Sequence, residues 1–279
     1  MTQHFRLRTC CSYKTSAKTR LHTTQLTCLM KNLKSILFFG LLLSASVPCK
    51  AQTGAKAATD SVRFTEYLPV NHADATKWIT RYQADIDRYQ SENLKLQDVS
   101  CDVLFIGSSS INMWDNIYQD MHPLKIIRRS YGGAAIRDMI YNYNTIARSY
   151  RPKSIALYVE NDLTGSREDI TVGETFDFFR IFINRLKRDY PGVPVFILSF
   201  KPSPARIKML PKQRTMNFLL EEYAEKEAQV FYVDVASCMY NREGEIRTDI
   251  FRDDNLHLNQ TGYDLWTAIL KPRLLKAVH

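Results

Sequence analysis

The sequence predicts an α/β fold in which a mostly parallel sheet of five strands lies between two layers of helices. Two observations predict it: five short, continuously apolar runs, and segments of helical periodicity between them. Continuously apolar strands are typical of parallel sheets covered on both faces, because neither face of such a strand meets water. We therefore expect a three-layer α/β/α domain.

The predicted elements alternate along residues 73–279. A first helical segment carries Trp78, Tyr82, Ile86 and Tyr89 close to the 3.6-residue period. The predicted strands are Val103–Ile106, Lys125–Ile127, Ile155–Val159, Val195–Leu198 and Val230–Val233. The predicted helices between and after them cover residues 136–149, 173–189, 206–228 and 262–277.

The positive charge of the chain is concentrated at its N-terminus. The chain has 38 Lys+Arg and 29 Asp+Glu, a net charge of +9, and residues 1–51 hold eight of the basic residues and no acidic one. Without that segment the net charge is +1, which is too small an excess of positive charge to indicate a broad phosphate-binding surface. We therefore expect no nucleic-acid partner. Hydrophobic residues at 45% and charged residues at 24% exclude wholesale disorder.

Residues 1–51 have the pattern of a secretory signal region. Lys31 and Lys34 precede an apolar run at 36–43, small residues follow, and Ala51 marks the preferred cleavage site. The run is shorter than the ~20 residues that span a bilayer, so we expect export to the periplasm or outside the cell, without stable membrane insertion after cleavage. Two alternatives stay open: a persistent signal anchor, and a lipid anchor at Cys49.

The segment before Met30 is polar, basic and free of acids, which is unusual for a signal peptide, so Met30 is the preferred initiator. Residues 52–72 are predicted to be a flexible lead-in, and residues 73–279 to form one domain. Of the six cysteines only Cys101 and Cys238 follow the predicted cleavage site, and their spacing matches no zinc pattern. We predict no metal and no cofactor; a disulfide and two free thiols both stay open.

The first predicted strand ends in Gly107-Ser108-Ser109-Ser110. A turn of small residues that opens a helix presents a hydroxyl beside free backbone N–H groups, which can stabilise a developing oxyanion. Serine is also a preferred helix cap whether or not catalysis occurs, so the structural alternative stays open at this point.

The last loop places Asp254 three residues before His257. A carboxylate at this spacing can bind one ring nitrogen and set the tautomer, which leaves the other nitrogen free to take a proton from a serine. An ordinary loop pair or a metal site are the alternatives.

Two further loops after strands carry Gly133, whose backbone N–H can approach a ligand, and Asn161, whose amide can donate. Each is also compatible with plain turn chemistry.

Taken together, the order of a Ser loop, a Gly loop, an Asn-Asp loop and Asp-x-x-His resembles the SGNH (GDSL-type) hydrolase superfamily over roughly residues 101–275. The resemblance implies a flavodoxin-like SGNH hydrolase fold, with Ser109 as nucleophile and Asp254 and His257 completing the triad. It also implies an oxyanion hole formed by the Ser109 N–H, the Gly133 N–H and the Asn161 amide. The extended run from Phe105 to Trp114 is similar to a branch of secreted bacterial GDSL-type esterases.

The sequence departs from the family pattern at two positions. Ser108 replaces the Asp that usually precedes the nucleophile, and Val159 replaces the Gly of Gly-x-Asn-Asp. Neither lost residue belongs to the triad, so activity remains the expectation, while Ser108 and Ser110 become rival nucleophiles.

The resemblance implies a small-molecule or glycan ester as substrate, and the predicted export together with the polar edge of the site favours carbohydrate O-deacetylation. A lipase, aryl esterase or thioesterase of the same superfamily, and an inactive carbohydrate- or envelope-binding protein on this scaffold, are the alternatives. Tyr131, Lys201 and Arg206 are the candidate substrate contacts. For each of them a packing or turn role is the alternative.

Overall fold

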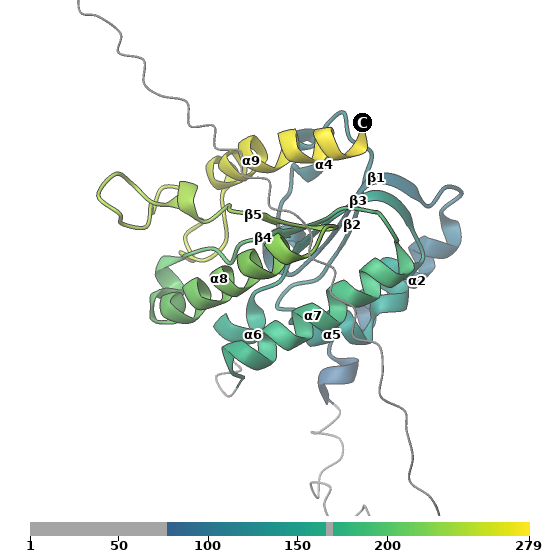
Figure 1. The fold of residues 1–279 in the computed structure, drawn as a ribbon, viewed down its shortest axis with the longest axis horizontal. Coiled ribbons are helices and arrows are strands. Elements are labelled where there is room, and N and C mark those ends of the chain that lie inside the picture. Colours follow the sequence, from purple (N-terminus) through teal and green to yellow (C-terminus); the bar gives the residue numbers. More distant parts are fainter. Residues whose placement is uncertain (1–76, 166–169) are drawn as a thin grey trace, which may run out of the picture. The chain divides into compact units, whose positions relative to one another are not determined.

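The computed structural model describes residues 77–165 and 170–279, and in them the chain is built around one parallel sheet of five strands. The predicted signal region and lead-in, residues 1–72, lie outside the described residues. The strand order is β2-β1-β3-β4-β5, and every neighbouring pair is parallel. Helices cover both faces of the sheet (Figure 1), which confirms the predicted three-layer class.

The strands are β1 (Ser100–Gly107), β2 (Ile126–Ser130), β3 (Arg151–Tyr158), β4 (Val195–Leu198) and β5 (Val230–Val233). The longer helices are α2 (Gln83–Lys95), α5 (Ile136–Tyr141), α7 (Val172–Asp189), α8 (Leu210–Lys226) and α9 (Gln260–Val278). Short helical turns are α3 (Ser109–Asn112), α4 (Ile117–Asp120), η2 (Asn144–Arg148), α6 (Asn161–Thr164), η3 (Pro204–Met209) and η4 (Ser237–Met239).

Strand β2 continues past its predicted end at Ile127. The sequence pattern stops there because Arg128 and Arg129 are charged, yet Arg129 is only 6% exposed. Its guanidinium lies over the rings of Tyr89 and Tyr150, at 4.7 and 5.0 Å from their centroids. Its Nη1 also lies 3.2 Å from Glu92 Oε2. Two aromatic faces and a carboxylate partner therefore let this edge strand carry a buried charge that an apolar criterion misses.

Two predicted helices are each divided in the structure. The segment predicted at 136–149 is divided at Asn142, which ends α5 and whose side-chain amide donates to the Asp138 carbonyl at 3.0 Å; η2 follows. The segment predicted at 206–228 begins as η3, in which Arg206 has non-helical dihedrals, and α8 follows with Pro211 in its first turn. Local hydrogen bonds and proline thus override the helical periodicity.

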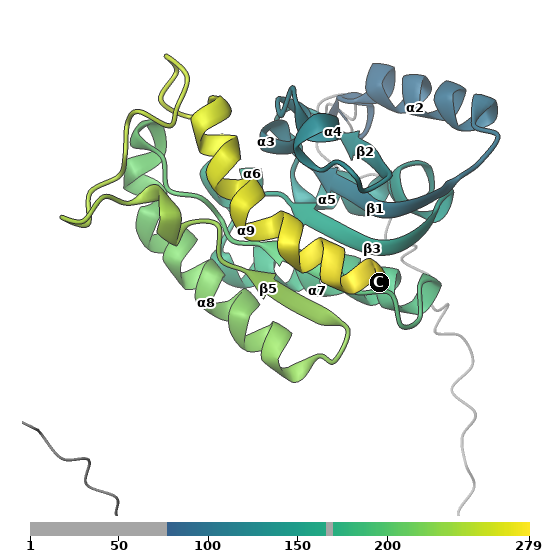
Figure 2. The same cartoon turned by 90° about the horizontal axis from the view of Figure 1, so that it is seen from above.

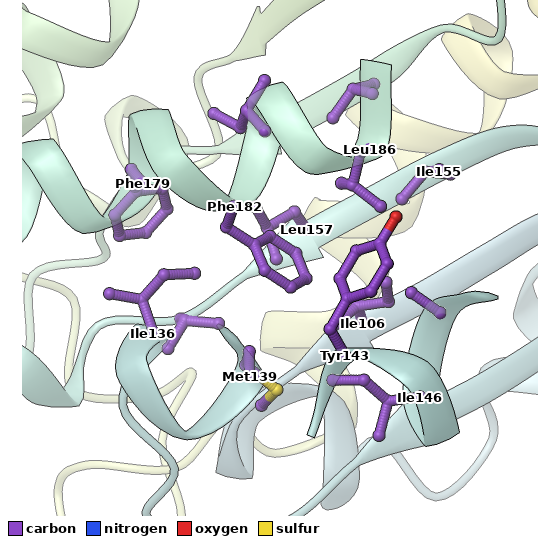
Figure 3. Close-up of a cluster of buried hydrophobic side chains, with 14 of the residues drawn as sticks. Ile106, Ile136, Met139, Tyr143, Ile146, Ile155, Leu157, Phe179, Phe182 and Leu186 are labelled. Atoms are coloured by element: carbon purple, nitrogen blue, oxygen red, sulfur yellow. The ribbon is translucent and has the colours of Figure 1, made fainter. Parts of the chain in front are cut away.

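The hydrophobic core forms two clusters, one on each face of the sheet. On β1, Leu104 and Ile106 belong to the first cluster, whereas Val103 and Phe105 belong to the second. The first cluster packs against α5 and α7 (Figure 3), and the second packs under α9, which lies on the near face in Figure 2. Strands that are buried on both faces explain the continuously apolar runs.

Within the described ranges, no helix has the length and apolar character needed to span a bilayer.

Candidate active site

Three loops of the predicted site leave the sheet at the same level. Gly107, the last residue of β1, is in register with Ser130 on β2 and with Tyr158 on β3. Since parallel strands end at one edge of a sheet, the loops that follow these three neighbours converge there. The structure therefore brings together the loops that carry the predicted hydroxyl and two of its predicted backbone and amide donors.

Ser109 is the first residue of α3 and is half-buried, whereas Ser108 and Ser110 are 0% and 1% exposed. Within the described residues, the Ser109 hydroxyl makes no hydrogen bond and its backbone N–H has no acceptor. Of the three consecutive serines, Ser109 is thus the one whose hydroxyl can reach a ligand. Its N–H is one of the unsatisfied donors of a helix N-terminus.

The turn that presents Ser109 depends on Gly107. A Cβ at this position would lie 2.4 Å from Ile111 Cγ1 and 2.7 Å from the Tyr158 carbonyl oxygen. We expect Gly107→Ala to lower the free energy of unfolding by about 1–3 kcal/mol, the usual cost of overpacking a dense core. Urea denaturation measures it. Gly173→Ala is the matched control, because a Cβ there meets nothing closer than 3.9 Å; an equal loss in both variants would contradict the steric explanation.

Asp254 holds His257 through three hydrogen bonds within one loop. The Asp254 Oδ2 lies 2.6 Å from His257 Nδ1, and Oδ1 accepts from the backbone N–H groups of Leu256 and His257, each at 2.9 Å. Burial by itself would raise the pKa of the Asp254 carboxyl, but these hydrogen bonds lower it to about 2. The carboxylate is therefore charged at neutral pH and orients the imidazole.

Side chains connect the segment around His257 to α3, which begins at Ser109, and to the residue that follows it. Arg252 donates from Nε to the Leu258 carbonyl at 3.0 Å and from Nη2 to the Met113 carbonyl at 2.8 Å. The Tyr263 hydroxyl donates to the Ser110 carbonyl at 2.9 Å. In the described part of the chain His257 Nε2 has no hydrogen-bond partner, so the nitrogen opposite Asp254 is available to a hydroxyl.

Among the described residues, the two backbone N–H groups of the predicted oxyanion hole have no acceptor, and the Asn161 amide has one hydrogen bonded and one free. Gly133 adopts a left-handed φ of +73°, and neither its N–H nor that of Ser109 has an acceptor among the described residues. Asn161 is 6% exposed and its amide donates one hydrogen to the Ala134 carbonyl at 3.0 Å. An amide has two such hydrogens, so the second remains for a ligand.

Carboxylates fix the loops that carry these donors. Asp162 Oδ2 accepts from the Ile136 N–H at 2.6 Å, and Asp138 Oδ2 accepts from the Ala135 N–H at 2.8 Å. The Asp162 bond joins the loop after β3 to the segment after β2, and the Asp138 bond closes the start of α5 within that segment. Such preset donors cost little reorganisation when charge develops.

Two of the predicted substrate contacts are corrected by the structure. The Tyr131 ring is 0% exposed and packs 4.6 Å from the Tyr82 ring, centroid to centroid. The Lys201 side chain is also 0% exposed, and its ammonium lies 3.1 Å from Glu160 Oε1. Both side chains point into the interior, where a surface ligand does not reach them. Burial lowers the pKa of the Lys201 ammonium, and the Glu160 carboxylate opposes that shift.

Arg206 is placed beside the site, but its guanidinium is occupied by protein groups. It donates to Asn161 Oδ1 at 3.0 Å, to Thr164 Oγ1 at 2.6 Å and to Glu160 Oε1 at 3.2 Å. The sequence analysis assigned no role to Glu160 or Thr164. The sequence did contain a signal for this cluster: Glu160 follows β3 and Lys201 follows β4, and these apolar strands are neighbours in the sheet.

Two further observations concern metal and thiol chemistry. Among the described residues, no three His, Cys, Asp or Glu side chains gather in an arrangement that could hold a metal ion. Cys101 and Cys238 are free thiols.

No protein-family model matches the chain, and no curated protein sequence matches it significantly. Several solved structures do match this chain. A candidate platelet activating factor from Streptococcus pneumoniae is similar with a TM-score of 0.63 and 23% identity, over 73% of this chain and 99% of that chain. A GDSL-like lipase from Bacteroides thetaiotaomicron is similar with a TM-score of 0.58 and 20% identity, over 70% of this chain and 98% of that chain.

A carbohydrate esterase family 3 protein from Talaromyces cellulolyticus is similar with a TM-score of 0.52 and 15% identity, over 64% of this chain and 98% of that chain. At these identities the likeness concerns the arrangement of the chain. The parallel five-stranded sheet, its helical layers and these relatives show that the chain has the SGNH (GDSL-type) hydrolase fold.

Proposed function

We propose that the protein is an exported serine ester hydrolase of the SGNH superfamily, in which Ser109 is the nucleophile, His257 the general base and Asp254 its orienting carboxylate. One observation carries the proposal: an accessible serine hydroxyl and unpaired N–H donors lie on converging loops, and a carboxylate-bound imidazole is tied to the same helix. The proposed oxyanion hole consists of the Ser109 N–H, the Gly133 N–H and the free hydrogen of the Asn161 amide.

The proposed mechanism is acyl transfer in two halves. His257 Nε2 takes the proton of Ser109 Oγ as the oxygen bonds to the ester carbonyl carbon, and the carbonyl oxygen becomes an oxyanion held by the donors. Collapse breaks the bond to the alcohol, which leaves with the proton from His257. Water then repeats the steps on the acyl-enzyme and releases the acid, so the enzyme returns to its starting protonation state.

The proposed substrate is an acetyl ester on a carbohydrate. Support comes from the predicted export and from solved structures of the same fold, among them the carbohydrate esterase above and an acetyl-xylooligosaccharide esterase from a Geobacillus, with a TM-score of 0.50 and 13% identity. A GDSL-like lipase shares the fold as well, so acyl chain length is the property to measure.

The test is hydrolysis of 4-nitrophenyl esters from acetate to dodecanoate, followed by acetate release from acetylated xylo-oligosaccharides. We expect the highest kcat/KM on the acetyl ester and release of acetate from the glycan. A maximum at long chains would replace the glycan substrate by a lipid ester. Absence of turnover on every ester would contradict hydrolysis itself and favour a binding protein on this scaffold.

Asn161→Ala is expected to lower kcat by roughly 10²–10³-fold, because it removes one donor to the oxyanion. KM for a small ester should change little, since the amide acts mainly after the tetrahedral charge has formed. Steady-state kinetics on 4-nitrophenyl acetate measure both constants. Asn184→Ala, an exposed position on α7, is the matched control and should retain wild-type kinetics. A rise in KM with unchanged kcat would show ground-state binding instead.

A further inference from the structure

A buried cluster of charges contacts Asn161, one of the proposed oxyanion donors, and has no part in the mechanism above. The Glu160 side chain is 3% exposed, that of Lys201 1% and that of Arg206 16%. Glu160 Oε1 accepts from Lys201 Nζ at 3.1 Å and from Arg206 Nη1 at 3.2 Å. Burying charges is costly unless they are paired and hydrogen-bonded, so a functional role would explain why this buried cluster is present.

The contacts of Arg206 suggest that reason. From one guanidinium, Nη1 reaches Glu160 and the Thr164 hydroxyl, while Nη2 donates to Asn161 Oδ1 at 3.0 Å. A guanidinium donates only, so the group of Asn161 that faces it is the carbonyl oxygen. The amide nitrogen is then on the opposite side, where it donates to the Ala134 carbonyl. Turned by 180°, the same side chain would offer no N–H to an oxyanion.

We infer that Arg206 is a positioning residue of the oxyanion hole: its guanidinium, anchored on the buried Glu160–Lys201 pair, holds the Asn161 amide with its N–H₂ toward the reacting carbonyl. A charge-assisted hydrogen bond to Oδ1 also polarises the amide and makes its N–H a better donor. This inference rests on the proposed function, and it replaces the predicted substrate contact of Arg206 by an action through Asn161.

The surrounding chain holds Arg206 in place from both sides. Gln213 Nε2 donates to the Lys201 carbonyl at 2.9 Å, which fixes the start of the segment. The Ala205 N–H donates to the Asn255 carbonyl at 3.1 Å, two residues before His257. The segment from Lys201 to Arg206 therefore contacts both the loop of Asn161 and the loop of His257.

A double-mutant cycle on 4-nitrophenyl acetate tests the inference with Arg206→Ala, Asn161→Ala and the double variant. Arg206→Ala should lower kcat about 10- to 100-fold, the cost of a misplaced catalytic group, with KM within twofold of the wild type. In the Asn161→Ala background it should cost no more than about twofold, because the group on which Arg206 acts is gone. Equal losses in both backgrounds would overturn the inference, as would a rise in KM alone.

Two further variants separate positioning from folding. Thr164→Val loosens one hydrogen bond of Arg206 without removing a charge, and it should reduce kcat in the same, Asn161-dependent way; unchanged kcat would count against the inference. Lys208→Ala removes an exposed positive charge from the same helical turn and should have wild-type kinetics. The wild-type rate is the separate test of the proposed function: without ester turnover the function fails, and with turnover only the cycle decides on Arg206.

Discussion

Ser109→Ala is expected to reduce kcat for ester hydrolysis about 10⁶-fold, the loss typical of removing a catalytic serine. The change deletes the only accessible hydroxyl of the serine run and leaves the backbone N–H of the hole in place. KM and the thermal unfolding temperature should remain close to those of the wild type, because the half-buried Ser109 hydroxyl forms no hydrogen bond in the described part of the chain. Steady-state kinetics and calorimetry on the purified proteins measure these quantities.

The neighbouring serines are the matched controls. Ser108→Ala and Ser110→Ala remove hydroxyls that are buried, so each variant should keep ester turnover and differ mainly in stability. Treatment with a fluorophosphonate and intact-mass analysis should add one phosphonyl group to the wild type and to both controls, and none to Ser109→Ala. A mass shift that survives in Ser109→Ala and disappears in a neighbour would move the nucleophile to that neighbour.

His257→Ala is expected to cost a similar factor, about 10⁶ in kcat, because the serine and its base act as one unit. For the same reason the Ser109→Ala/His257→Ala double variant should be no slower than either single variant. Asp254→Asn should lose less, since the imidazole remains and only its orientation and charge partner are weakened. The three rates are compared on one ester at pH 8.

His122→Ala is the control for loss of a histidine, because this side chain is exposed in a connecting segment far along the chain from Asp254. It should turn over esters at the wild-type rate. If His257→Ala retained even a tenth of the wild-type activity, the imidazole would not be the general base and the loop pair would have only a structural role.

The predicted strands at 195–198 and 230–233 agree with the structure because their apolar runs are short and flanked by polar or turn residues. The same criterion failed at Arg129, where burial depends on the Glu92 carboxylate and on the rings of Tyr89 and Tyr150, all distant along the chain. Sequence patterns thus locate strands whose neighbours are ordinary. Sequence patterns do not detect strand residues that are polar and become buried through tertiary contacts.

The candidate site shows the same division. Asp254 and His257 are three residues apart in one loop, so their hydrogen bond could be predicted locally. Glu160 and Lys201 are 41 positions apart, and their pairing depends on β3 and β4 being neighbours with both side chains turned inward. No periodicity contains that information. The substrate contact predicted for Lys201 assumed that a lysine after a strand is solvent-exposed, as lysines usually are. The Lys201 side chain is instead buried against Glu160.

The packing of α9 determines the stage of protein synthesis at which the Ser109 turn becomes supported. Tyr263 stacks on Trp114 at 4.8 Å and donates to the Ser110 carbonyl, and Trp266 lies 5.0 Å from the ring of Tyr158. The turn that carries Ser109, the proposed nucleophile, is therefore completed by the last helix of the described chain. Loss of this helix leaves the Asp254–His257 pair in its own loop but removes the contacts that support the Ser109 turn. We therefore expect a nascent or clipped polypeptide without α9 to lack ester turnover.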